Sequence, residues 1–141
     1  MNEAVTQDLT EVKKSLGRCL LNAKHDKRFL ERFYEIFLAS HPAVKDAFAD
    51  TNFEKQLMAL KNGLNMAILF AEGDTLAEDV LKHIQVTHSR KHMAIDPKLY
   101  PHWSGSLMKT IEEFDERLNE ETKALWEYVL RTSVNYIISE Y

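Results

Sequence analysis

Residues 75–88 read TLAEDVLKHIQVTH, a stretch whose apolar residues recur at helical spacing and whose last member is a histidine. Residues spaced by four lie on one face of a helix. One such row consists of Leu76, Val80, Ile84 and His88. Because a globular protein buries the apolar face of a helix, we expect this row to face the core. His88 then directs an imidazole inward, either as a ligand for a bound group or as a core histidine that the backbone satisfies.

Helical spacing of apolar residues also runs through the rest of the chain, and alternating strand patterns are absent. Asp26 and Asn119 are expected to cap helices, Thr75 with Glu78 has the spacing of a capping box, and Gly73 is expected to end a helix. The expected helices span residues 6–23, 26–40, 42–48, 51–72, 75–88, 96–115 and 119–138. In the last helix, the residues expected to face inward are Leu125, Val129, Val134, Ile137 and Ile138. Seven helices, two of them short, indicate an all-α arrangement that is not a simple bundle.

The composition and charge of the chain exclude several classes of protein. The 141 residues fit one domain, spanning residues 1–141. A net charge of −4 with scattered lysines and arginines does not resemble a nucleic-acid-binding surface. The N-terminus is polar and acidic, unlike a signal peptide, and the most apolar stretch, residues 64–71, is too short to span a membrane. Cys19 is the only cysteine, so we expect it to be a small core residue of a cytoplasmic protein. The charge pattern and the short apolar stretch together predict no nucleic-acid partner and no membrane partner.

Four short motifs, each weak alone, follow one another at separations that are typical of one protein family. In chain order they are Phe33-Tyr34 with Pro42 and Phe48, Gln56 with Leu60, Thr87-His88 with His92, and residues 95–100 (IDPKLY) with Trp103. Over essentially its whole length the chain therefore resembles a single-domain bacterial globin, related to the haem domains of flavohaemoglobins. The resemblance implies a globin fold of about seven helices around a haem pocket.

The resemblance implies that the chain binds haem b with His88 as the metal ligand. Porphyrin supplies four nitrogens to the iron, so the protein contributes one axial nitrogen, here Nε2 of His88. The Nδ1–H group of the same ring then needs an acceptor. The Ile84 carbonyl and the Thr87 hydroxyl are both within helical reach of it.

Two further residues contact the haem in this interpretation. Phe48 presses on the porphyrin face, although a plain core aromatic would show the same burial. His92 approaches a haem propionate, as do Arg90 or Lys91. Without haem, His88 and His92 are spaced to chelate a metal ion, but no clear motif supplies a third and a fourth ligand.

On the opposite side of the haem, the resemblance places Tyr34 and Gln56. Tyr34 lies on the apolar face of its helix, where a buried hydroxyl needs a partner, and it could donate to bound dioxygen. Gln56 could add a second donor through its amide, with Leu60 one turn further along the same helix. A shift of one residue in the loosely matched segment 49–54 would put Lys55 in the place of Gln56.

On the His88 side, flavohaemoglobins polarise the haem ligand with a tyrosine and a glutamate. Tyr100 matches the tyrosine, but counting on from Trp126 places Tyr141 where the glutamate is expected. Glu140 is adjacent, yet a neighbouring position on a helix points elsewhere. We therefore expect weak electron donation to the iron from this side.

The function that the resemblance implies is reversible binding of dioxygen for scavenging or storage, without catalysis. The alternatives are a nitric oxide dioxygenase that depends on a separate reductase, and a haem-based gas sensor. The expected partners are dioxygen and other diatomic gases and, in the enzymatic case, a reductase. The sequence leaves open the physiological ligand, with sulfide among the candidates, and the choice between a monomer and a homodimer.

Overall fold

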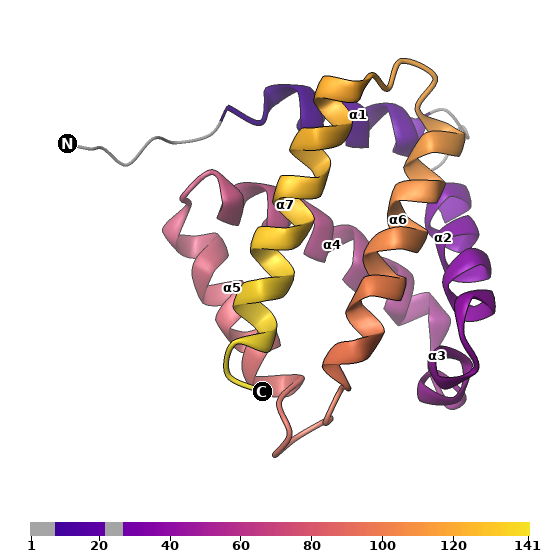
Figure 1. The fold of residues 1–141 in the computed structure, drawn as a ribbon, viewed down its shortest axis with the longest axis vertical. Coiled ribbons are helices and arrows are strands. Elements are labelled where there is room, and N and C mark those ends of the chain that lie inside the picture. Colours follow the sequence, from indigo (N-terminus) through magenta and orange to yellow (C-terminus); the bar gives the residue numbers. More distant parts are fainter. Residues whose placement is uncertain (1–7, 22–26) are drawn as a thin grey trace.

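The computed structural model describes residues 8–21 and 27–141, and every regular element within these ranges is a helix (Figure 1). The elements are α1 (Thr10–Leu21), α2 (Lys27–Ser40), α3 (Pro42–Ala47), α4 (Phe53–Ala71), α5 (Thr75–Thr87), the 3-10 turn η1 (Pro97–Leu99), α6 (Tyr100–Phe114) and α7 (Glu120–Ile138). The all-α prediction is confirmed. None of the described helices combines the length and the apolar run that crossing a membrane requires.

Helices that are distant in sequence pack against one another. α2 packs on α6 and α5 packs on α7, and α5 also packs on α4, which directly precedes it in the chain. Figure 1 shows α1 crossing one end of α6 and α7, and the C-terminus lying beside the loop that follows α5. The end of α7 therefore reaches the segment that carries His88.

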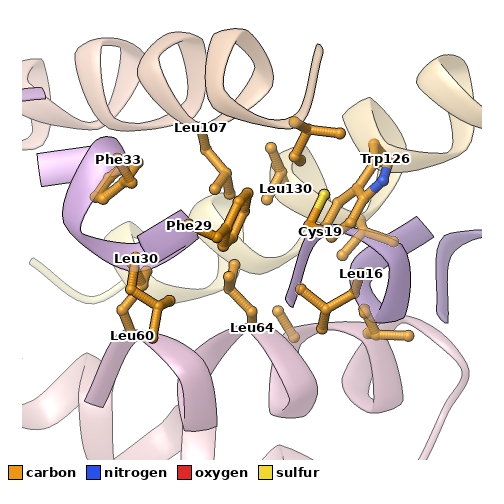
Figure 2. Close-up of a cluster of buried hydrophobic side chains, with 14 of the residues drawn as sticks. Leu16, Cys19, Phe29, Leu30, Phe33, Leu60, Leu64, Leu107, Trp126 and Leu130 are labelled. Atoms are coloured by element: carbon orange, nitrogen blue, oxygen red, sulfur yellow. The ribbon is translucent and has the colours of Figure 1, made fainter. Parts of the chain in front are cut away.

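Among the described residues, the core is a cluster of apolar side chains from six helices, α1 to α4, α6 and α7 (Figure 2). Its members include Leu16 from α1, Phe29 from α2, Leu64 from α4, Leu107 from α6 and Trp126 from α7. Cys19 joins this cluster and is fully buried. Burial, together with the nearby negative charge of Asp115, raises the pKa of the Cys19 thiol to about 12. The thiol is therefore protonated and unreactive, which confirms its expected place as a small core residue.

Local signals located several helix ends correctly. Asn119 caps α7 by accepting a hydrogen bond from the Thr122 amide at 2.8 Å. Gly73 follows α4 with a φ of 92°, a conformation that glycine adopts without a steric penalty. Within the described residues the first helix begins at Thr10, whose amide donates to the Asp8 carboxylate at 3.0 Å, and the predicted start at residue 6 lies outside the described residues.

The start of α5 differs from the prediction by one residue. Asp74 is the cap and accepts from the Ala77 amide at 2.9 Å, so Thr75 and Glu78 do not form the expected capping box. An aspartate is at least as good a cap as a threonine, which explains the shift. The expected cap at Asp26 lies outside the described residues.

The expectation that the row from Leu76 to His88 faces the core is wrong in its first half. Leu76 is 75% exposed and Val80 is 41% exposed. The buried residues of α5 are Ala77, Leu81 and Gln85, one position further along and so about 100° around the helix. α4 and α7 pack on this second row, in which a satisfied glutamine takes the place of a third apolar residue.

The inward face of α7 also differs in part from the prediction. Val129 is fully buried, as expected. The other four expected residues are only half-buried: Leu125, Val134, Ile137 and Ile138. The residues that share the buried face with Val129 are Thr122, Trp126, Leu130 and Ser133. The spacing of apolar residues did not predict this face, because two of its buried positions carry the small polar side chains of Thr122 and Ser133.

Candidate functional site

Tyr34 lies on α2 inside an aromatic cage and is only 5% exposed. The rings of Phe33, Phe37, Phe48 and Phe53 have centroids 4.8–6.4 Å from the Tyr34 ring. Burial raises the pKa of the Tyr34 hydroxyl to about 12, although a hydrogen bond from Gln56 opposes the shift. The phenol is therefore protonated at neutral pH and able to donate a hydrogen bond.

The partner of the Tyr34 hydroxyl comes from α4. The Gln56 amide Nε2 donates to the Tyr34 oxygen at 3.0 Å. Because this oxygen accepts from Gln56, its own hydrogen remains free for another acceptor. The Lys55 side chain is exposed, and Leu60, one turn beyond Gln56, is buried. The structure thus brings Gln56 and not Lys55 to Tyr34.

Phe48 and Phe53 close the cage at the junction of α3 and α4. Phe48 is half-buried, with its ring centroid 5.6 Å from that of Phe37 and 6.4 Å from that of Phe53. The sequence prediction included Phe48 but missed Phe53, which falls in the loosely matched segment 49–54. The available signal was its spacing, since an aromatic residue three positions before Gln56 lies on the same helix face.

His88 ends α5 and has its ring oriented by the helix itself. Its Nδ1 lies 2.8 Å from the Ile84 carbonyl oxygen and 3.4 Å from the Thr87 hydroxyl oxygen. A carbonyl oxygen only accepts hydrogen bonds, so Nδ1 carries the hydrogen and Nε2 carries a lone pair. The expected acceptor for Nδ1–H is therefore confirmed, and the tautomer is the one that a metal ligand through Nε2 requires.

The protonation state of His88 also suits a ligand. Partial burial lowers the pKa of the imidazole, and the hydrogen bond to Ile84 only partly offsets this effect. The ring is therefore neutral at pH 7. Within the described residues, no protein group forms a hydrogen bond with its Nε2. Nε2 thus has a free lone pair on a half-buried residue.

The donor set fits a haem better than a metal ion held by protein alone. In the part of the chain that the structure describes, no group of three His, Cys, Asp or Glu side chains gathers as a metal site would require. His92 is exposed in the turn after α5, and its backbone amide donates to the Ser89 carbonyl. A haem needs only one nitrogen ligand from the protein, and Nε2 of His88 can supply it. The protonated Tyr34 hydroxyl can in addition donate a hydrogen bond.

Tyr100 begins α6 and is half-buried. Burial raises the pKa of its hydroxyl to about 12, and the electrostatic influence of Tyr141 adds to the shift. Tyr141, at the position where the resemblance expected a glutamate, is therefore within electrostatic range of Tyr100. Glu140 is exposed.

Comparisons with known proteins agree on one family. The family model described as Globin matches residues 31–137. A flavohemoprotein of Oceanobacillus iheyensis is 30% identical over 108 residues, which is 74% of this chain and 26% of that protein. A flavohemoprotein of Bacillus cereus is 32% identical over 94 residues, 62% of this chain and 23% of that protein. The chain thus spans about a quarter of the length of the curated relatives it matches.

A solved structure covers nearly the whole chain. It is a protein from Pseudomonas aeruginosa PAO1, described as structurally highly homologous to a human hemoglobin. It superposes with a TM-score of 0.86 at 30% identity, covering 94% of this chain and 97% of the other. The helices described above therefore form the globin fold.

Proposed function

The chain belongs to the globin family, and from this premise we propose that it binds one haem b through Nε2 of His88 and binds dioxygen reversibly. The observation that carries the proposal is the state of His88. Its ring is neutral, its Nδ1–H is bonded to the Ile84 carbonyl, and its Nε2 lone pair is free. Phe48, at the edge of the aromatic cage, is the residue that we propose to lie against the porphyrin.

The iron of a bound haem supplies the site at which a diatomic gas binds. The contribution of this chain is a hydrogen-bond donor on the gas side, the hydroxyl of Tyr34. Gln56 donates a hydrogen bond to the phenol oxygen, so the hydroxyl hydrogen is available to a different acceptor. Such a donor favours a ligand that draws negative charge, as dioxygen does, because hydrogen bonds to charged acceptors are the stronger ones. Slow release of dioxygen follows, which suits scavenging or storage better than bulk transport.

The second candidate function is nitric oxide dioxygenation, which the likeness to flavohaemoglobin haem domains favours. That reaction would consume dioxygen and nitric oxide and yield nitrate, and a separate reductase would supply the electron that each turnover needs. Tyr34 suits this chemistry as a donor to dioxygen. We expect weaker electron donation through Tyr100 than in flavohaemoglobins, because Tyr141 stands at the position where the resemblance expected a glutamate.

An absorption spectrum of the purified protein tests the proposal. We expect a Soret band in the ferric protein, and a ferrous spectrum that shifts with dioxygen and returns when the gas is removed. A protein that carries no haem after haem is supplied during expression would contradict the proposal. Nitrate yield from nitric oxide, measured with and without an added reductase, separates the two functions: sustained turnover with the reductase favours the second.

A further inference from the structure

The last turn of α7 is attached to α5 just before His88. Gln85 lies on the buried face of α5 and is 7% exposed. Its amide Nε2 donates to the Tyr136 carbonyl at 2.7 Å and lies 3.1 Å from the Ser139 hydroxyl. The same carbonyl also accepts from the Ser139 hydroxyl at 2.7 Å and from the Ser139 amide at 3.4 Å, so Gln85 adds a bond between the two helices at a C-terminus that Ser139 already caps.

A second attachment joins the same two segments just after His88. The Arg90 amide donates to the Tyr141 main-chain oxygen at 3.1 Å. The Arg90 guanidinium carbon lies 5.0 Å from the centroid of the Tyr141 ring, which is within the range of a cation–π interaction. Figure 1 shows this meeting of the end of α7 with the loop after α5. The two attachments therefore flank His88, three residues before it and two after it.

Between these attachments, the turn that carries His88 is held mainly by its own backbone. The Ile95 amide donates to the His88 carbonyl at 3.1 Å, and the Met93 amide donates to the Thr87 carbonyl at 3.0 Å. Residues 90–94 are all exposed, so little side-chain packing fixes the turn against the core. The orientation of this turn relative to the rest of the molecule therefore depends on the contacts that Gln85 and Arg90 make with the end of α7.

We propose that Gln85 and Tyr141 are positioning residues for the haem ligand, which dock the end of α7 on the segment 85–90 and so fix the direction of the His88 imidazole. This inference rests on the proposed function, in which His88 binds the iron. Tyr141 acts through Arg90 and Gln85 acts through the α7 carbonyl, so neither needs to touch the haem. Loss of either attachment leaves the ligand in place but lets its turn move.

The rate of haem release to an excess of haem-free acceptor globin measures the effect. We expect Tyr141→Ala and Arg90→Ala each to release haem about two- to fivefold faster, the size of one exposed cation–π contact. Tyr141→Phe keeps the ring and should restore the wild-type rate. Arg131→Ala, which removes an exposed arginine elsewhere on α7, is the matched control and should leave the rate unchanged. Gln85→Leu should speed release by about two- to tenfold, since it removes the side-chain hydrogen bond that joins α5 to the end of α7.

The double variant of Arg90 and Tyr141 separates this proposal from a direct haem contact. If the two residues act on each other, the double variant releases haem no faster than either single one. If Arg90 instead binds a propionate, Arg90→Ala speeds release while Tyr141→Ala does not, and the proposal is overturned.

Amide hydrogen exchange of the protein as purified gives a readout that does not depend on haem. We expect the amides of His88 to Ile95 to exchange faster in Tyr141→Ala and Gln85→Leu than in the wild type, with the helix α2 unchanged. Unchanged exchange in both variants would overturn the positioning inference even if His88→Ala loses haem. A wild-type protein without haem would overturn the proposed function, while the exchange data would still decide whether α7 holds the turn.

Discussion

The buried Tyr34 hydroxyl accepts a hydrogen bond from Gln56, and no protein group among the described residues accepts its own hydrogen. A hydrogen bond to a charged acceptor is worth roughly 1.5–3 kcal/mol, and each 1.4 kcal/mol corresponds to about tenfold in an equilibrium constant. Tyr34→Phe should therefore raise the dioxygen dissociation rate by about ten- to a hundredfold, with little change in the helix content. Flash photolysis or rapid mixing measures this rate. A rate within about twofold of the wild type would show that the hydroxyl serves another acceptor.

At the neighbouring position the choice between Gln56 and Lys55 can be decided by a pair of variants. Gln56 contacts the Tyr34 oxygen, whereas the Lys55 side chain is exposed. We therefore expect Gln56→Leu to change the dioxygen and carbon monoxide kinetics, and Lys55→Ala to leave them as they are. A ferric spectrum that is low-spin in the wild type and becomes high-spin in Lys55→Ala would instead make lysine the residue over the iron.

At the scale of the elements, Asp115 joins the end of α6 to α1. Its carboxylate accepts from the Ser15 hydroxyl at 2.6 Å and from the Arg18 guanidinium at 2.6 and 3.0 Å. Ser15 in turn accepts from the Trp126 indole at 2.9 Å, which adds α7 to the network. This network could not be predicted from the sequence, because Ser15 and Asp115 are 100 residues apart and neither belongs to a recognisable motif.

The pH dependence of this network follows from the pKa of Asp115. Burial alone would raise that pKa, but hydrogen bonds from Arg18, Ser15 and the Arg117 amide lower it below the usual value. A lowered pKa in the folded state means that the carboxylate stabilises the fold above its unfolded pKa of about 3.9 and ceases to do so as the pH falls through the folded value.

We therefore expect Asp115→Asn to reduce the free energy of unfolding at pH 7 by about 1.5–3 kcal/mol, the loss of a charged hydrogen-bond acceptor. Urea unfolding measures the change. The difference between variant and wild type should shrink as the pH falls below about 4. Glu113→Gln breaks a similar two-bond pair with Arg32 at the surface and should have little effect, which makes it the control. An equal loss in both variants would contradict the account of the buried network.

α5 shows why a helix can be predicted while its buried face is not. The spacing of apolar residues indicated the helix correctly, but two neighbouring rows both contain apolar residues. Which row is buried depends on what α4 and α7 present to it. Gln85 can occupy the buried row because its amide donates to the Tyr136 carbonyl at the end of α7. Tyr136 is 51 residues away in the sequence, so no local pattern around Gln85 indicates this bond.

At the scale of the whole molecule, the order of helices and several of their ends were predictable because their signals are local. Asn119 and Gly73 mark helix ends by their own chemistry. The Ile84 acceptor of His88 was predictable for the same reason, since it lies within one helix turn. The contact of Gln56 with Tyr34 and the place of Arg90 over Tyr141 join separate elements, and only the assembled fold brings them together.

Haem content after replacement of His88 is the most direct test of the central claim, that this imidazole is the iron ligand. Purified His88→Ala, His92→Ala and wild-type protein are compared by haem per polypeptide and by the Soret spectrum. We predict about one haem per chain in the wild type, an unchanged spectrum with at most faster haem loss in His92→Ala, and little or no retained haem in His88→Ala. A His88→Ala protein with the wild-type haem content and spectrum would contradict the claim.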